Sequence, residues 1–282
     1  MPRPIHLVAL TLLALVIICA AHLAPPAAAR HVAFGHGPTV VLLHGLGSSA
    51  EDWLPTARRL ASRHRVELVD LPGHGGTEMP EPFSLERAAA ALDASLAQIS
   101  DEPVILVGHS LGGLLAAAEA IEHPARVRGL VLVETALKPQ IPEDQRAAAL
   151  DRLEHDYRAV LHEAYMDFGR DAAQGEKLYR NVAALDPRMV SRWIRIAWTA
   201  DLSPEAPRLT VPVLVVLAER SWPSGQAWGA AAETLGYEGA PRLRALRIEG
   251  CGHFIMLDRP DRLAAVIAGF SADPEGLRMT MR

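Results

Sequence analysis

Short apolar runs alternate with stretches of helical character along most of the chain. The runs are rich in Val, Ile and Leu and have the length of buried strands; they lie at residues 39–43, 66–69, 104–107, 127–133, 211–217 and 243–248. The stretches of helical character lie at residues 53–63, 84–99, 113–118 and 260–270. Strands that alternate with helices pair in parallel through right-handed crossovers. The pattern therefore predicts an α/β fold with a doubly wound, mostly parallel sheet.

The hydrophobic pattern changes in the middle and at both ends of the chain. Residues 137–207 are charged, helical in character and rich in Tyr and Trp, which predicts a helical lid inserted over the carboxyl edge of the sheet, where open α/β folds bind ligands. The core of the domain is then formed by residues 30–136 and 208–270. Residues 271–282 are expected to be a flexible tail. Little sequence precedes residue 39 for an edge hairpin.

The first 29 residues have the features of a secretory signal peptide. A basic residue, Arg3, precedes an apolar run at residues 7–23, and Ala27-Ala28-Ala29 follows it, so that cleavage is expected after Ala29. The run, at about 17 residues, is also long enough for an uncleaved membrane anchor, with residues 5–23 associating with the membrane. Residues 1–29 are therefore interpreted as a signal peptide or membrane anchor, and a secreted or periplasmic location is expected.

Composition narrows the range of partners. The chain has 282 residues, half of them apolar, and a formal net charge of -5 with scattered Lys and Arg, which argues against nucleic acid as a partner. The histidines do not have the spacing of zinc ligands, so no metal is assigned. Cys19 and Cys251 cannot form a disulfide if Cys19 belongs to a removed signal peptide.

One motif lies between an apolar run and a small-residue stretch. Gly108-His109-Ser110-Leu111-Gly112 follows the strand expected at residues 104–107 and precedes the helix that contains residues 113–118. A tight strand-to-helix turn strains the backbone of its central residue, and the flanking glycines allow the strand and the helix to approach closely. This is the G-x-S-x-G nucleophile elbow, and Ser110 is its candidate nucleophile.

Three further loops accompany the elbow. They are His44-Gly45-Leu46-Gly47 after the first strand, Asp70-Leu71-Pro72-Gly73-His74-Gly75 after the second, and Gly252-His253 after the last. In this order the four landmarks resemble the α/β-hydrolase fold superfamily over residues 32–270. The resemblance implies that Ser110 is the nucleophile, that His253 is the general base, and that the backbone amides of Leu46 and Leu111 form the oxyanion hole. A serine hydroxyl needs such a base, and an oxyanion needs donors that are fixed in advance.

The acid of the triad departs from the common pattern of this superfamily. Many members carry Gly-x-x-Asp after the strand that corresponds to residues 213–217, but here Ser221 stands at the position of that aspartate. Other members place the acid after the preceding strand, where this chain has Glu134. A carboxylate at the end of a buried strand is costly without a partner. Glu134 is therefore the predicted acid, with Glu219 and then Asp258 as the alternatives.

These features predict a serine hydrolase. The expected reaction is cleavage of carboxylic esters of small or medium apolar acyl groups through an acyl-enzyme, without a cofactor, on a small-molecule ester or lipid. The predicted export signal argues against cytosolic substrates such as acyl-carrier or coenzyme A thioesters. An aminopeptidase or amidase is one alternative, and it would need a lid carboxylate such as Glu154, Asp156 or Glu163. A catalytically silent binding protein with this fold is the other.

Overall fold

The chain folds around a seven-stranded sheet with the strand order β1-β3-β2-β4-β5-β6-β7. The structure is a computed structural model and describes residues 31–276. The strands are β1 (His31–Gly35), β2 (Thr39–Leu43), β3 (Arg65–Val69), β4 (Val104–His109), β5 (Val127–Val133), β6 (Val213–Ala218) and β7 (Leu243–Ile248). Strand β1 pairs antiparallel with β3, and the other neighbouring strands pair in parallel. The doubly wound, mostly parallel sheet predicted from the sequence is confirmed.

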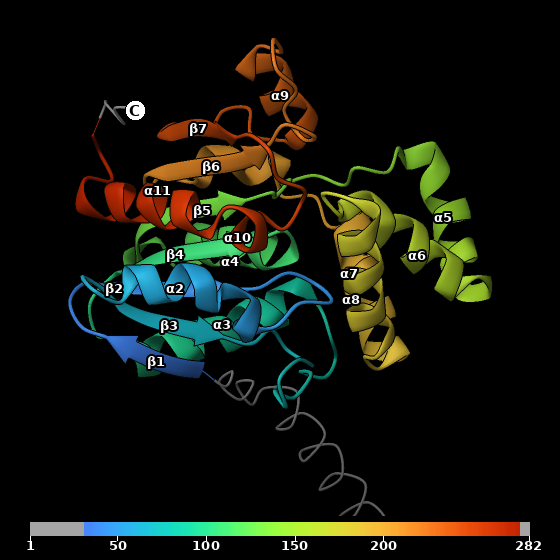
Figure 1. The fold of residues 1–282 in the computed structure, drawn as a ribbon, viewed down its shortest axis with the longest axis horizontal. Coiled ribbons are helices and arrows are strands. Elements are labelled where there is room, and N and C mark those ends of the chain that lie inside the picture. The colour runs from blue at the N-terminus through green and yellow to red at the C-terminus, as the bar shows by residue number, and fades with distance from the viewer. Residues whose placement is uncertain (1–30, 277–282) are drawn as a thin grey trace, which may run out of the picture.

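Helices cover both faces of this sheet. Helices α2 (Leu54–Leu60) and α11 (Pro260–Ala272) lie side by side on one face, and α3 (Leu85–Ile99) and α4 (Leu111–Glu122) lie side by side on the other (Figure 1). Every residue of β4 and β6 is buried, which explains why these strands are continuous apolar runs. The shorter elements are η1 (Ala50–Trp53), η2 (Pro124–Arg126), α9 (Trp228–Leu235) and α10 (Ile255–Asp258).

A group of helices lies between β5 and β6 in the sequence. It comprises α5 (Glu143–His155), α6 (Tyr157–Phe168), α7 (Ala172–Ala183), α8 (Pro187–Thr199) and η3 (Ser203–Arg208). In Figure 1 helices α5 to α8 stand to one side of the sheet, beyond the carboxyl ends of the parallel strands. We call residues 137–207 the helical insertion. None of the helices in the described residues is both long enough and apolar enough to cross a membrane.

The edge strand β1 was not expected from the sequence. Its residues are mostly exposed, because it pairs only with β3 at the edge of the sheet and does not contribute an apolar run. Its polar contact is the ring of His31, whose Nδ1 lies 2.8 Å from Oε2 of the buried Glu67 on β3. Backbone pairing, this polar contact and the packing of the half-buried Phe34 against the core hold the strand. Hydrophobic patterning does not detect the first two.

The C-terminal helix extends beyond its predicted end. Helix α11 continues to Ala272, and the hydroxyl of the buried Ser271 lies 3.1 Å from His64 Nε2 and accepts a hydrogen bond of 3.1 Å from Arg128 Nη2. The prediction therefore placed the start of the flexible tail too early, at residue 271, inside helix α11. Residues 277–282, and the signal peptide or anchor predicted for residues 1–29, lie outside the described residues.

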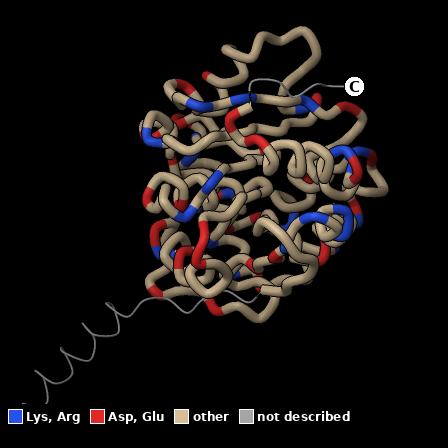
Figure 2. Tube along the Cα trace, turned by 90° about the vertical axis from the view of Figure 1, so that its left-hand side faces the viewer, with Lys and Arg blue, Asp and Glu red and all other residues tan. Residues whose placement is uncertain are grey.

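Charged residues of both signs are interspersed over the molecule. Figure 2 shows basic and acidic positions mixed along the elements on the side that it presents. The negative net charge of the chain is thus distributed and does not form a single strongly charged face in this view.

Candidate active site

Ser110 lies at a strained turn between β4 and α4. Its backbone angles are φ 51° and ψ -118°, and within residues 31–276 the only other non-glycine residue with positive φ is Glu134. Such angles cost free energy and persist only where the surrounding structure enforces them. A Cβ on Gly108 would lie 2.5 Å from the Cα of Gly113, and a Cβ on Gly112 would lie 3.0 Å from the carbonyl oxygen of Leu43. The two motif glycines are therefore required by close approach, as the sequence predicts.

His253 and Glu134 meet at the carboxyl ends of their strands. Glu134 follows β5 directly, His253 lies in the loop between β7 and α10, and His253 Nδ1 is 3.0 Å from Glu134 Oε2. Burial alone would raise the pKa of Glu134, but the hydrogen bond and the charge of His253, together with other donors, hold it below its usual value. Glu134 is thus ionised and accepts the hydrogen bond. In the neutral imidazole the proton then resides on Nδ1, which leaves Nε2 free to accept a proton.

The serine that replaces the common aspartate contacts Glu134. The hydroxyl of Ser221 donates to Glu134 Oε2 at 2.8 Å, and the amide of Ala218 donates to Oε1 at 2.6 Å. Arg220 adds a positive charge, with Nη1 3.7 Å from Oε2. Ser221 therefore supports a carboxylate supplied by the neighbouring strand instead of supplying one itself.

The two alternative acids are placed differently. Glu219 is exposed to solvent. The side chain of Asp258 is buried, but it accepts hydrogen bonds from Arg170, from Gln174 and from the amide of Gly252. Of the three carboxylates considered, Glu134 is the one that contacts the His253 ring.

Two residues that were not assigned to the site hold His253 in place. The ring of Phe168, at the end of α6, stacks on the His253 ring with centroids 4.4 Å apart, and the Phe168 carbonyl accepts from the His253 amide at 3.0 Å. Burial lowers the pKa of His109 well below its usual value, so its neutral ring donates from Nε2 to the His253 carbonyl at 2.9 Å. His109 belongs to the serine motif, but only the fold reveals its contact with His253. The aromatic content of residues 137–207 did not single out Phe168.

The two predicted oxyanion-hole residues lie in different loops or elements that reach the same cavity. Leu111 is the first residue of α4, so its amide has no acceptor within the helix. Leu46 lies in the loop between β2 and η1, and both residues line the same cavity as Ser110.

This cavity has a volume of about 540 Å³. It is lined by Ser110, Glu134 and His253 and by side chains of α6 and α8 from the helical insertion. Among the described residues that line the cavity, Glu134 is the only acidic one. The lid carboxylates considered for an aminopeptidase do not line the cavity: Glu154 pairs with Arg195, and Glu163 and Asp156 pair with Arg152.

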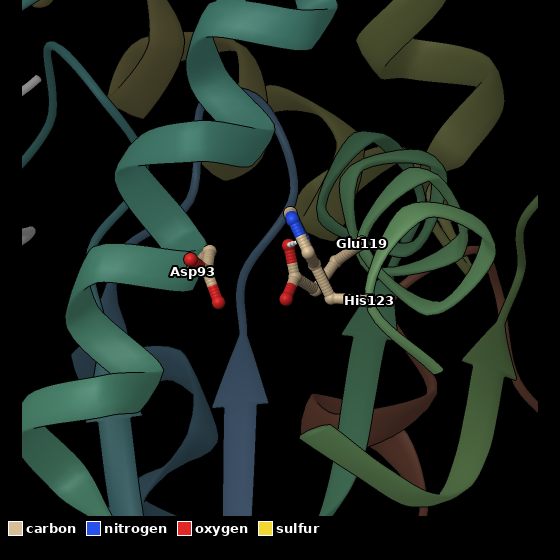
Figure 3. Close-up of side chains that lie close together, drawn as sticks. All are labelled: Asp93, Glu119 and His123. Carbon is tan, nitrogen blue, oxygen red and sulfur yellow. Dashed lines mark hydrogen bonds and ion pairs between the residues drawn. The ribbon is translucent and has the colours of Figure 1, made fainter. Parts of the chain in front are cut away.

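A second group of titratable side chains lies between α3 and α4, away from the cavity. Asp93, Glu119 and His123 face one another, and one ligand atom from each lies within 4.8 Å of the others (Figure 3). Arg126 Nε donates to Asp93 at 3.0 Å, and His123 Nδ1 lies 3.2 Å from Glu119. Burial raises the pKa of Glu119 to about 7. Arg126 thus offsets the negative charge of Asp93, and Glu119 retains its proton up to about pH 7. We assign no metal to this cluster.

A parallel sheet with a serine at a strained turn after its central strand, and with a carboxylate and a histidine after later strands, defines the α/β-hydrolase class of proteins. The family model described as the alpha/beta hydrolase family matches residues 40–266, and the chain belongs to this family. The resemblance inferred from the sequence is confirmed.

Several known proteins are similar to this chain. A pimeloyl-[acyl-carrier protein] methyl ester esterase of Xanthomonas axonopodis pv. citri is 30% identical over 258 residues, which cover 84% of this chain and 96% of the relative. The structure of a hydrolase from Oleispira antarctica has a TM-score of 0.73 and 17% identity and covers 87% of this chain and 95% of its own. A thermophilic esterase from Thermogutta terrifontis has a TM-score of 0.72 and 23% identity, with 88% and 94% covered. At these identities the structural likeness shows the fold alone.

Proposed function

We propose that the chain is a serine esterase that cleaves carboxylic esters of small or medium apolar acyl groups through an acyl-enzyme. The observation that carries this proposal is the hydrogen bond from His253 to an ionised, buried Glu134, in a cavity that these two residues line together with Ser110. The relative from Xanthomonas axonopodis pv. citri, by its name an ester hydrolase, supports ester chemistry.

The first half of the reaction forms the acyl-enzyme. His253 Nε2 accepts the proton of the Ser110 hydroxyl as the serine oxygen attacks the ester carbonyl. Glu134 stabilises the imidazolium that results, because its negative charge faces Nδ1 at 3.0 Å. The amides of Leu46 and Leu111 donate to the oxyanion of the tetrahedral intermediate. The intermediate collapses as His253 protonates the departing alcohol.

The second half releases the acid. A water molecule attacks the acyl-enzyme while His253 Nε2 takes its proton, and the second tetrahedral intermediate uses the same oxyanion hole. Collapse of that intermediate returns the proton to Ser110. The cycle needs no cofactor, because His253 passes the proton of Ser110 to the departing alcohol and the proton of the water to Ser110.

The substrate class follows from the cavity and the relatives. A cavity of about 540 Å³ falls within the range of small-molecule sites and suits a small or medium acyl group. The relative from Xanthomonas axonopodis pv. citri is, by its name, an esterase of a methyl ester on an acyl-carrier protein. The predicted export segment at residues 1–29 argues against a carrier-bound substrate for this chain. An amidase is not favoured, because the carboxylates that would bind an amine pair with arginines outside the cavity.

Hydrolysis of p-nitrophenyl esters from acetate to palmitate tests the proposal. We expect turnover with an optimum at short or medium chains, and we expect the Ser110→Ala variant to lose it. Equal turnover by the variant would refute the assignment of Ser110. An absence of turnover across the series would refute the proposed ester specificity.

A further inference from the structure

One tyrosine of the helical insertion contacts the loop that carries Leu46. The hydroxyl of Tyr165, on α6, donates to the Leu46 carbonyl at 2.7 Å. Tyr165 is buried, and burial raises the pKa of its hydroxyl, so the group keeps its proton and acts as a donor. We call residues 44–49 the oxyanion loop.

The two peptide groups on either side of the Leu46 Cα are both held. The Gly45 carbonyl accepts from His44 Nδ1 at 2.7 Å; this nitrogen carries the proton because His44 Nε2 accepts from the Leu71 amide at 3.1 Å. That peptide group includes the Leu46 N–H, the predicted oxyanion donor. Tyr165 holds the next peptide group through the Leu46 carbonyl. Together the two hydrogen bonds restrict both backbone torsions of Leu46.

The next residue shows how closely the insertion covers this loop. Gly47 has a φ of +71°, and a Cβ at this position would meet the Tyr165 hydroxyl and lie 2.7 Å from Cβ of Val182 on α7. Helices α6 and α7 therefore pack directly on the backbone of the oxyanion loop. The orientation of this backbone depends on residues far away in the sequence.

From these contacts we propose that Tyr165 is a positioning residue for the oxyanion hole and holds the Leu46 amide in the orientation that receives the oxyanion. The inference rests on the proposed function. Tyr165 donates to a backbone carbonyl, so it acts through Leu46 and does not itself contact the oxyanion. Oxyanion donors lower the barrier because they are oriented before charge develops. Loosening the loop should therefore slow the chemical step more than it weakens substrate binding.

The test compares two Tyr→Phe variants on the same helix. Tyr165→Phe removes one hydroxyl and keeps the buried ring, so we expect the variant to fold. Tyr157→Phe is the matched control, because the Tyr157 hydroxyl is buried without a hydrogen-bond partner among the described residues and does not line the cavity. We expect kcat to fall about tenfold in Tyr165→Phe with KM within about twofold, and both constants to stay within about twofold in Tyr157→Phe.

A second measurement does not depend on turnover. Amide hydrogen exchange in the oxyanion loop should be faster in Tyr165→Phe than in the wild type and unchanged in Tyr157→Phe. An unchanged kcat in Tyr165→Phe, or an equal loss in both variants, would overturn the positioning role while leaving the esterase itself established. If the wild type shows no turnover that depends on Ser110, the proposed function is refuted. In that case the hydrogen-exchange measurement still tests the second proposal: unchanged exchange in the oxyanion loop of Tyr165→Phe would show that Tyr165 does not hold the loop.

Discussion

At the scale of single residues, Glu134 combines three features, each of which by itself lowers the stability of the folded state. Its side chain is buried, its φ is 50°, and it is ionised where burial favours the neutral acid. The donors that offset this cost are His253, Ser221 and the Ala218 amide. A buried carboxylate with this many donors beside a histidine is typical of a residue that orients an imidazole.

Glu134→Gln should therefore impair the chemical step. A glutamine at this position keeps the shape but can donate to Nδ1, which places the imidazole proton on Nε2, and it removes the charge that stabilises an imidazolium. We expect kcat to fall by about 10³- to 10⁴-fold, by analogy with the replacement of the triad aspartate by asparagine in serine proteases. The matched control is Glu219→Gln, which changes an exposed carboxylate and should leave kcat unchanged. Ester hydrolysis by the purified variants measures both, and full activity of Glu134→Gln would contradict the assignment.

Single residues differ in how much of their role the sequence reveals. Ser110 was predicted because its motif is local, with the strand, the turn and the helix all contiguous. Glu134 was predicted because it ends a buried strand and the usual aspartate is missing. The contact between Ser221 and Glu134 could not be predicted, since it joins residues that follow two different strands and lie far apart in the sequence. The same holds for His109 and Phe168, whose partners lie far away in the sequence.

At the scale of elements, helices α3 and α4 meet at a buried carboxylate. Glu119 lies on α4 and faces Asp93 on α3 and His123, which directly follows α4 (Figure 3). The charge of Arg126, in η2, acts on the same carboxylate. Burial raises the pKa of Glu119 to about 7 from an ordinary value of 4.5. Between pH 4.5 and about pH 7, Glu119 therefore keeps a proton in the folded protein that it has lost in the unfolded chain. The contribution of Glu119 to the unfolding free energy therefore falls as the pH rises from 4.5 to about 7.

The Glu119→Gln variant should not show this pH dependence. Glutamine stays neutral at every pH, so the unfolding free energy of the variant relative to the wild type should rise by about 2 kcal/mol between pH 5 and pH 8. Urea denaturation at the two pH values measures the difference, and other titrating groups cancel in the comparison. A difference that is constant with pH would show that Glu119 is already ionised at pH 5.

The elements themselves were largely predictable. The central strands follow the apolar pattern closely, because a buried parallel sheet needs continuous apolar runs. Helices α3 and α11 also lie close to the residues predicted for them. Strand β1 was missed because an edge strand needs only backbone partners on one side. The end of α11 was placed too early because the contacts of Ser271 with His64 and Arg128 are tertiary.

At the scale of the whole molecule, the cavity is built by two parts of the chain that are separate in the sequence. The sheet supplies Ser110, Glu134 and His253, and the helical insertion supplies Tyr165 and Phe168. The sequence predicted both parts but not the cavity, because its shape depends on how α6 and α8 pack over the strand ends. The stacking of Phe168 on His253 and the hydrogen bond of Tyr165 join the parts. The helical insertion thus contacts both the proposed base and the oxyanion loop.

The central claim is that Ser110 is a nucleophile activated by His253 and Glu134. Labelling of the full chain with a fluorophosphonate, followed by mass spectrometry of the intact protein and of its peptides, tests this most directly because the probe needs no knowledge of the substrate. We predict a single adduct on Ser110 in the wild type, no adduct in Ser110→Ala and much slower labelling in Glu134→Gln. An unlabelled wild type, or equal labelling of Ser110→Ala, would contradict the account.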